Sequence, residues 1–185
     1  KRAEFAGNYT SRADALLAAS GTPIVLNACS VTVTGGAIVT FSPNYILNVE
    51  NTVNTLGGTM NFLEGASLIQ DNDVTNGVGV TTGGNVGDIH YTRSTTIVSE
   101  YDYTYWSSPV ANQALSNVSP DSPNDYYYYF SPAIANWVNI PSINLMDVGK
   151  GYIIRAPYYA NGSTGYASTF IGTPNSGTIT TPIVM

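Results

Sequence analysis

A short internal repeat constrains the fold more than any other feature of the sequence. Residues 31–41 align with residues 53–63, 22 positions further along the chain, and both segments carry a Gly-Gly pair at the same place. The same offset puts residues 24–25 over residues 46–47. A period of roughly 20–30 residues is typical of a β-solenoid, in which one rung cannot bury its inward face alone and must be stacked on others. The repeat predicts stacked parallel rungs, with an ordinary β-sandwich of similar hairpins as the alternative.

The remaining sequence also favours strands. From Ile24 onward, β-branched residues, Thr and Asn are punctuated by Gly and Pro, which is typical of short strands joined by turns. The one helical pattern lies before this point, where Ser11 can cap a stripe of Ala and Leu residues and Gly21 would end it. We therefore predict an all-β chain with three parts: a short N-terminal helix or arm (1–22), a small parallel β-solenoid (23–90) and an antiparallel β-sandwich-like module (91–185).

Charge is scarce, and its balance argues against two classes of protein. Only 10% of the residues are charged, and six bases against twelve acids give a net charge of −6. Nucleic-acid binding needs a basic surface, so we expect no nucleic-acid partner. No apolar run approaches the length of about 18 residues that a membrane-spanning helix needs, so we expect no membrane span. The single cysteine, Cys29, cannot form an internal disulfide and is expected to be buried.

Aromatic residues are concentrated in the second half of the chain. Strand alternation over residues 101–106 places three tyrosines on one face and Trp106 on the other. We expect Trp106 and Trp137 to lie in a core. A run of four tyrosines follows, of which alternation forces two outward, and Tyr is enriched at contact surfaces. The candidate contact residues are therefore Tyr126, Tyr127, Tyr128 and Tyr129.

No motif in the sequence assembles a catalytic site. The acids are scattered, His90 is the only histidine, and Ser107 and Ser108 lack the glycines of a nucleophile elbow. We therefore predict no catalytic residues, no cofactor and no metal. Calcium is the alternative because one stretch offers several oxygen ligands, although it lacks the downstream Glu of a calcium loop and an Asx-rich turn is favoured. Its candidate ligands are Asp71, Asp73 and Asn76.

Five segments carry a resemblance to a known class of proteins. They are Gly-Ala-Ser-Leu-Ile-Gln at 65–70, Tyr-Asp-Tyr-Thr-Tyr-Trp-Ser-Ser-Pro-Val at 101–110, Asn-Trp-Val at 136–138, Met-Asp-Val-Gly-Lys-Gly-Tyr-Ile-Ile-Arg-Ala-Pro at 146–157 and Phe-Ile-Gly-Thr-Pro-Asn-Ser-Gly-Thr at 170–178. Together, over residues 56–180, they resemble a module of large secreted and cell-surface proteins of Bacteroidota such as Flavobacterium. The resemblance implies an extracellular location, with export through the outer membrane as cargo of the type IX secretion system. We expect both ends of the chain to be cuts in a longer precursor.

These observations lead to a hypothesis about function. We expect a non-catalytic structural or adhesive part of a cell-surface protein, whose partners are other chains of the same surface assembly or the secretion machinery. One variant is a filament or surface-array subunit joined by strand exchange through residues 1–20 or 173–185, because open strand edges can be completed by a neighbour. The alternative is a carbohydrate-binding module that contacts glycans with exposed tyrosines, and a polysaccharide-active enzyme is less favoured.

Overall fold

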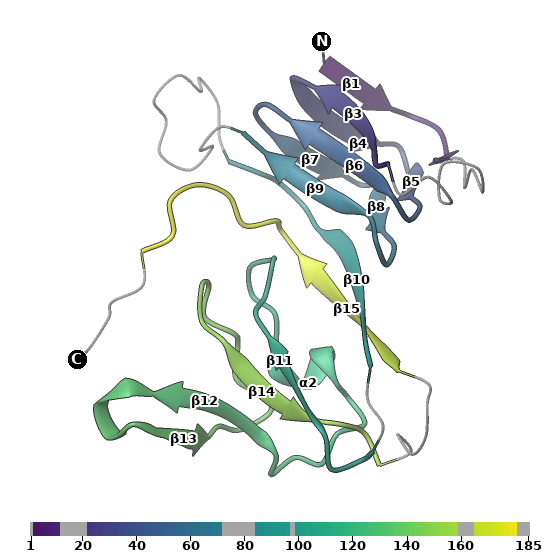
Figure 1. Ribbon diagram of the computed structural model, residues 1–185. Coiled ribbons are helices and arrows are strands. Elements are labelled where there is room, and N and C mark those ends of the chain that lie inside the picture. The colour runs from purple at the N-terminus through teal and green to yellow at the C-terminus, as the bar shows by residue number, and fades with distance from the viewer. Residues whose placement is uncertain (1, 12–21, 72–83, 97–98, 159–164, 181–185) are drawn as a thin grey trace. The chain divides into compact units, whose positions relative to one another are not determined.

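The chain folds into two compact units in a computed structural model (Figure 1), which describes residues 2–11, 22–71, 84–96, 99–158 and 165–180. Unit 1 comprises residues 1–93 and 171–178, and unit 2 comprises residues 94–170 and 179–185. The division differs from the predicted one in two respects. The first unit ends at Arg93 rather than at residue 90, and the segment 171–178 belongs to it although it lies near the end of the sequence.

Unit 1 contains the predicted parallel β-solenoid. Its strands lie in sheets of order β1-β4-β7, β3-β6-β9 and β15-β10-β8-β5-β2, of which β15 (Tyr166–Gly172) begins in unit 2. The paired strands among β1–β10 run parallel. These strands are β1 (Arg2–Phe5), β2 (Tyr9–Thr10), β3 (Ile24–Ala28), β4 (Ser30–Thr34), β5 (Ile38–Phe41), β6 (Tyr45–Val49), β7 (Val53–Leu56), β8 (Thr59–Phe62), β9 (Ser67–Gln70) and β10 (Ile89–Thr95).

The N-terminal arm is only partly separate from this solenoid. Strand β1 pairs with β4, and β2 pairs with β5, so residues 2–10 add strands to two of its sheets. The predicted helix falls on residues 12–21, which lie outside the described residues. The predicted arm over residues 1–22 is therefore paired with the solenoid through its strands β1 and β2.

The register of the repeat changes by one residue at the corners of the solenoid. Val31 pairs with Val53, as the offset of 22 predicts. Ile24 instead pairs with Tyr45, and Ile38 pairs with Thr59, an offset of 21 in both cases. The predicted alignments of residues 24–25 and of residues 38–41 are therefore one position out. The corners of successive rungs differ in length. The corner at residues 50–52 is one residue longer than the equivalent corner at residues 29–30, and the next corner, residues 57–58, is one residue shorter than residues 35–37. The two differences cancel, so the rungs stay in step.

Stacked aromatic rings form the centre of the solenoid core. Phe41 and Phe62 are fully buried, and their ring centroids lie 4.9 Å apart in a stacked arrangement. Tyr9 continues the stack on one side at 6.3 Å and Tyr91 on the other at 5.7 Å. Because each rung places an aromatic ring over the ring of the next, packing between rungs is continuous, as solenoid stability requires. Cys29, expected to be buried, is only partly so, and the Asn51 side-chain amide donates to its Sγ at 3.2 Å.

Unit 2 is built on a four-stranded antiparallel sheet of order β11-β14-β12-β13. Its strands are β11 (Tyr103–Trp106), β12 (Tyr127–Ser131), β13 (Asn136–Asn139) and β14 (Tyr152–Arg155), and the unit also holds helix α2 (Leu115–Val118), a 3₁₀ turn (Pro132–Ile134) and the first residues of β15 (Tyr166–Gly172). The predicted all-β class is confirmed. No membrane-spanning helix is present among the described residues.

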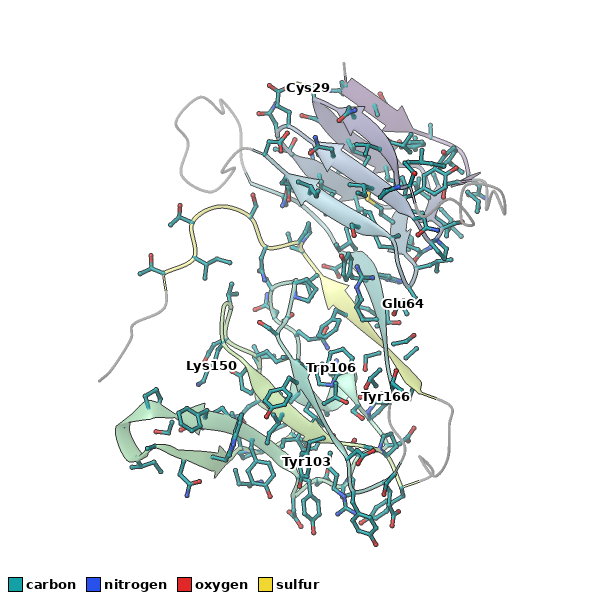
Figure 2. The ribbon with its side chains drawn as sticks, in the orientation of Figure 1. Cys29, Glu64, Tyr103, Trp106, Lys150 and Tyr166 are labelled. Atoms are coloured by element: carbon teal, nitrogen blue, oxygen red, sulfur yellow. The ribbon has the colours of Figure 1, made fainter. Side chains whose placement is uncertain are left out.

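The inner face of this sheet is covered by β15 and α2. Trp106 is 8% exposed, and its ring packs against Tyr166 at 6.4 Å (Figure 2). It also packs against Phe170 at 5.6 Å. The hydroxyl of Ser168 donates to the carbonyl oxygen of Val118 at the end of α2, which ties β15 to the helix. The core position predicted for Trp106 is confirmed.

Candidate functional site

Five aromatic side chains lie together on the outer face of the sheet of unit 2, and we call them the aromatic face: Tyr103, Tyr105, Tyr128, Phe130 and Trp137. Strand register brings them together, because directly paired residues project from the same side of a sheet. Tyr105 and Tyr128 both pair with Ile153 of β14, and Phe130 pairs with Trp137. Four of the five are exposed, at 39% for Tyr103, 74% for Tyr105, 46% for Phe130 and 37% for Trp137.

The rings of the aromatic face support one another. Tyr103 contacts Tyr128 edge-on, with centroids 6.2 Å apart. Trp137 lies between Tyr105 at 6.0 Å and Phe130 at 5.5 Å, and the last pair is also edge-to-face. Edge-to-face pairs place the positive edge of one ring against the negative face of the next and are favourable beyond the area they bury. The face is therefore held in place by its own contacts.

A buried arginine stands at the end of this face, surrounded by three further tyrosines. Arg155 pairs with Tyr103 across the sheet and is only 8% exposed. Its guanidinium carbon lies 4.5 Å from the ring centre of Tyr126, 4.7 Å from that of Tyr101 and 6.0 Å from that of Tyr158. Nε donates to the carbonyl oxygen of Glu100 at 2.7 Å. We call Arg155 and the three rings the arginine cage; each ring face attracts the cation.

Burial also affects the titration of the aromatic face. Desolvation raises the pKa of the Tyr103 hydroxyl, and the neighbouring Tyr128 acts in the same direction, whereas Arg155 lowers it. Desolvation is the largest of these causes. The hydroxyl of Tyr103 is therefore neutral at physiological pH and serves as both donor and acceptor.

The four predicted contact tyrosines are divided between the two faces of the sheet. Tyr126 and Tyr128 take part in the arginine cage and the aromatic face, respectively. Tyr127 is 1% exposed, and its hydroxyl donates to the carbonyl oxygen of Ser119 at 2.7 Å, so its prediction as a contact residue is wrong. Tyr129 pairs with Tyr152 on the inner side.

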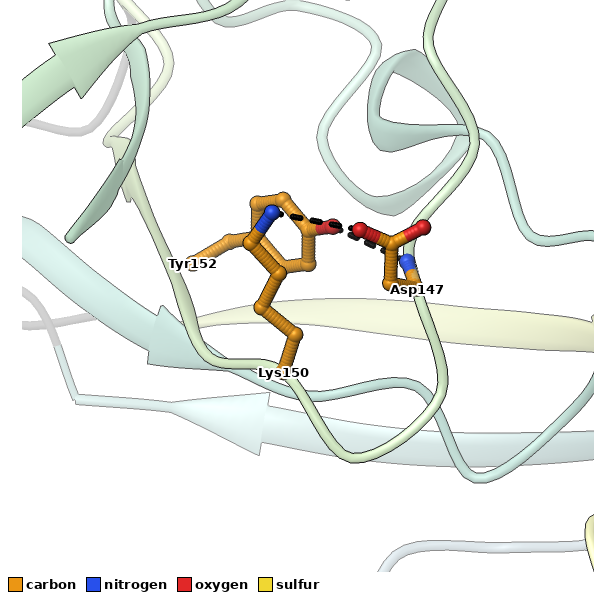
Figure 3. A network of polar contacts seen from close by, with 3 residues as sticks. All are labelled: Asp147, Lys150 and Tyr152. Atoms are coloured by element: carbon orange, nitrogen blue, oxygen red, sulfur yellow. Dashed lines mark hydrogen bonds and ion pairs between the residues drawn. The ribbon is translucent and has the colours of Figure 1, made fainter. Parts of the chain in front are cut away.

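A small polar network lies beside Tyr129, in the turn that leads into β14 (Figure 3). The Nζ of Lys150 forms an ion pair with Oδ2 of Asp147 at 3.1 Å, and the backbone N–H of Asp147 donates to the Tyr152 hydroxyl at 2.9 Å. The same ammonium lies 4.0 Å from the ring centre of Tyr129. An exposed ion pair contributes little to stability, so we assign this network no role beyond the local structure of the turn.

Several members of the site were missed or misplaced by sequence reasoning. Trp137 was predicted in the core, yet it is exposed because its pairing partner Phe130 points outward. Phe130, Tyr158 and Arg155 were not predicted as contact residues. The alternation of the Tyr101–Trp106 segment was the signal that did find the face, since Tyr103 and Tyr105 are exposed and Trp106 is buried.

The candidate calcium ligands are only partly described. Asp71 is exposed, and its backbone N–H donates to the carbonyl oxygen of Val49 at 3.0 Å. Asp73 and Asn76 lie outside the described residues. Within the part of the chain that the structure describes, no group of three or more His, Cys, Asp or Glu side chains could hold a metal ion.

Comparisons with known proteins assign the chain to a family. No curated protein and no solved structure is significantly similar to it. A family model matches residues 13–185, which include the four-stranded sheet of unit 2 and the solenoid from β3 onward, whereas β1 and β2 precede the matched residues. The chain therefore belongs to the family described as a domain of unknown function, DUF8693.

Proposed function

We propose that the chain is a non-catalytic adhesive module of an extracellular bacterial protein, and that the aromatic face makes the contact. The observation that supports this is the row of exposed rings on one sheet, with four side chains more than a third exposed. Clustered exposed apolar surface is unfavourable in water and marks interaction sites more often than scattered apolar residues do. Tyr, Trp and Arg are also the residue types that dominate binding energy at interfaces.

The extracellular part of the proposal rests on the resemblance of residues 56–180 to modules of Bacteroidota surface proteins. Export by type IX secretion follows from the same resemblance. Immunolabelling of intact cells, with and without added protease, tests it in the bacterium that encodes the chain. We expect labelling of the parent strain and its loss in a strain that lacks the type IX machinery. Equal labelling of both strains would contradict this export route.

Bead adhesion tests the contact surface directly. Beads coated with the purified chain should adhere to bacterial cells or their extracellular matrix. Replacing Tyr105, Phe130 and Trp137 together by Ser should lower the number of attached beads at least tenfold, because the face loses three of its rings. The control carries Val25→Ser and Ile38→Ser, which remove solenoid side chains that are 49% and 47% exposed. Equal adhesion of both variants, confirmed as folded by circular dichroism, would refute the aromatic face as the contact.

A second candidate function is that of a filament or surface-array subunit. Its support is the β3-β6-β9 sheet, in which β3 and β9 are the edge strands among the described residues. Edge strands present backbone groups that a neighbouring chain can pair with. In the first proposed exchange segment, 1–20, strands β1 and β2 pair with β4 and β5 of the same chain, so exchange would repeat these pairings between chains. A light-scattering mass that stays monomeric at high concentration would refute this candidate.

A further inference from the structure

We infer that the aromatic face binds a neutral glycan, whose sugar rings stack on the exposed tyrosine and tryptophan rings. The inference rests on the proposed function and names the substance to which the module adheres. Two properties of the face support it. No exposed charged side chain lies among the outer-side residues of β11–β14, and the exposed side chains combine aromatic ring faces with phenolic hydroxyls.

The charge of the face is the first argument. Among the residues of β11–β14 that share the outer side, the charged one is Arg155, which is 8% exposed beneath its cage of rings. Lys150 lies beside Tyr129, which pairs on the other side of the sheet. An anionic polymer would find no exposed cation among these residues to pair with it, and a neutral polymer is the complementary ligand.

The chemistry of the rings is the second argument. A sugar ring has one side lined with C–H groups, and these are attracted to the negative face of an aromatic ring. Its edge carries hydroxyls, which can exchange hydrogen bonds with the phenol groups of Tyr103 and Tyr105. Both tyrosines are exposed, Tyr105 by 74%. Indole and phenol rings thus cover the apolar side of a sugar while phenolic hydroxyls reach its polar edge.

The arrangement of the rings favours a chain of sugars over a single one. Tyr105, Trp137 and Phe130 form a continuous row, with neighbouring centroids 6.0 and 5.5 Å apart. The row crosses from one edge strand of the sheet, β11, to the other edge strand, β13, and its neighbour β12. Neighbouring rings are tilted by 60° and 74°, so a polysaccharide lying along the row stacks on the face of one ring and contacts the edge of the next. The affinity then depends on more than one ring.

Affinity electrophoresis of the full chain tests the inference. The gels contain neutral polysaccharides (hydroxyethylcellulose, mannan or starch) or anionic ones (alginate or polygalacturonate). We expect retardation in at least one neutral gel, unchanged when the salt concentration is raised, because salt screens only charged contacts. Trp137→Ala and Tyr105→Ala should each weaken binding about tenfold or more, and Trp137→Phe, which keeps a ring, should retain part of it. Ile38→Ala in the solenoid should bind as the parent does.

Treatment of the target cells separates this inference from the proposed function. Periodate oxidises sugars, so it should abolish adhesion of the coated beads, whereas protease should leave adhesion intact. Adhesion that depends on the aromatic face but survives periodate and is lost after protease would overturn the glycan inference and leave the proposed function standing. Retardation only in anionic gels, lost on adding salt, would also overturn it. Adhesion that does not depend on the aromatic face would refute the proposed function itself.

Discussion

The guanidinium of Arg155 lies against the ring of Tyr126, with the guanidinium carbon 4.5 Å from the ring centre. Arg155 ends β14 and Tyr126 immediately precedes the neighbouring strand β12, and the backbone N–H of Arg155 donates to the carbonyl oxygen of Tyr126 at 3.1 Å. The contact accommodates a charge that is almost fully removed from water, and it orders the tyrosines at the end of the aromatic face. Cation–π attraction strengthens when the cation is desolvated, as it is here.

Replacement of Arg155 tests how much this contact contributes. We expect Arg155→Met to lower the free energy of unfolding by about 1–3 kcal/mol, because it removes the cation–π contacts and the hydrogen bond to Glu100 while keeping an apolar stem. Arg155→Lys should fall between the parent and Arg155→Met, since it keeps the charge but loses the planar fork. Urea denaturation measures both values. A variant as stable as the parent would show that the cage contributes nothing to folding.

Removal of a ring from the solenoid stack should cost more. Phe62→Ala leaves a cavity between Phe41 and Tyr91, whose rings lie on either side of it, and we expect a loss of about 3–5 kcal/mol. Ile38→Ala removes a side chain that is 47% exposed in the neighbouring strand and should cost far less. Denaturation followed by far-ultraviolet circular dichroism compares the two. Equal losses would mean that the stack does not hold the rungs together.

A glycine at a solenoid corner gives a steric test of the register. A Cβ atom on Gly58 would lie 2.5 Å from Cγ1 of Val33 and 2.8 Å from the carbonyl oxygen of Ala37. Gly58→Ala should therefore destabilise the chain by about 1–3 kcal/mol through overpacking. Gly7→Ala is the matched control, because no atom lies within 4 Å of a Cβ placed there. Thermal unfolding should show a lower midpoint for the first variant and an unchanged one for the second.

Stability should fall in alkaline solution because of Tyr127. Desolvation raises the pKa of its hydroxyl from 10.0 to about 12, so the folded state holds this proton more tightly than the unfolded state does. The resulting stabilisation is fully present below pH 10.0 and is lost as the pH rises toward about 12. Urea denaturation at a series of pH values should show this decline, and Tyr127→Phe should make it shallower. An equally steep decline in Tyr127→Phe would exclude this tyrosine as a cause.

The solenoid could be predicted because similar residue types recur at equivalent positions of successive rungs. The offset between Val31 and Val53 is the true register, and the corner glycines mark the same turns in successive rungs. The predicted offset is one position out for residues 24–25 and 38–41, because a corner can gain or lose one residue without changing the alternating pattern of the strands beside it. Alternation gives the two faces of each strand, but only pairing with a neighbour fixes where the register falls.

The aromatic face was harder to predict for a related reason. Alternation predicts that two of the four consecutive tyrosines face outward, but four identical residues do not show which two. The pairing of Tyr127 with Ile154 and of Tyr128 with Ile153 decides this. Trp137 faces outward because the turn after β12 sets its pairing with Phe130, and that turn contains Ala135 in a left-handed conformation (φ 48°) that its residue type does not announce. The return of residues 171–178 to unit 1 depends on distant contacts, which no local pattern encodes.

The two tryptophans lie on opposite sides of the sheet of unit 2, so their fluorescence reports on each side separately. Trp106 is shielded at 8% exposure, and Trp137 is open to solvent at 37%. A soluble quencher should reach the emission of Trp137 and leave that of Trp106 largely untouched. A molecule that binds to the outer side should shift the emission of Trp137 toward shorter wavelengths and leave that of Trp106 unchanged. Occupancy of the surface can therefore be followed in solution without attaching a dye to the chain.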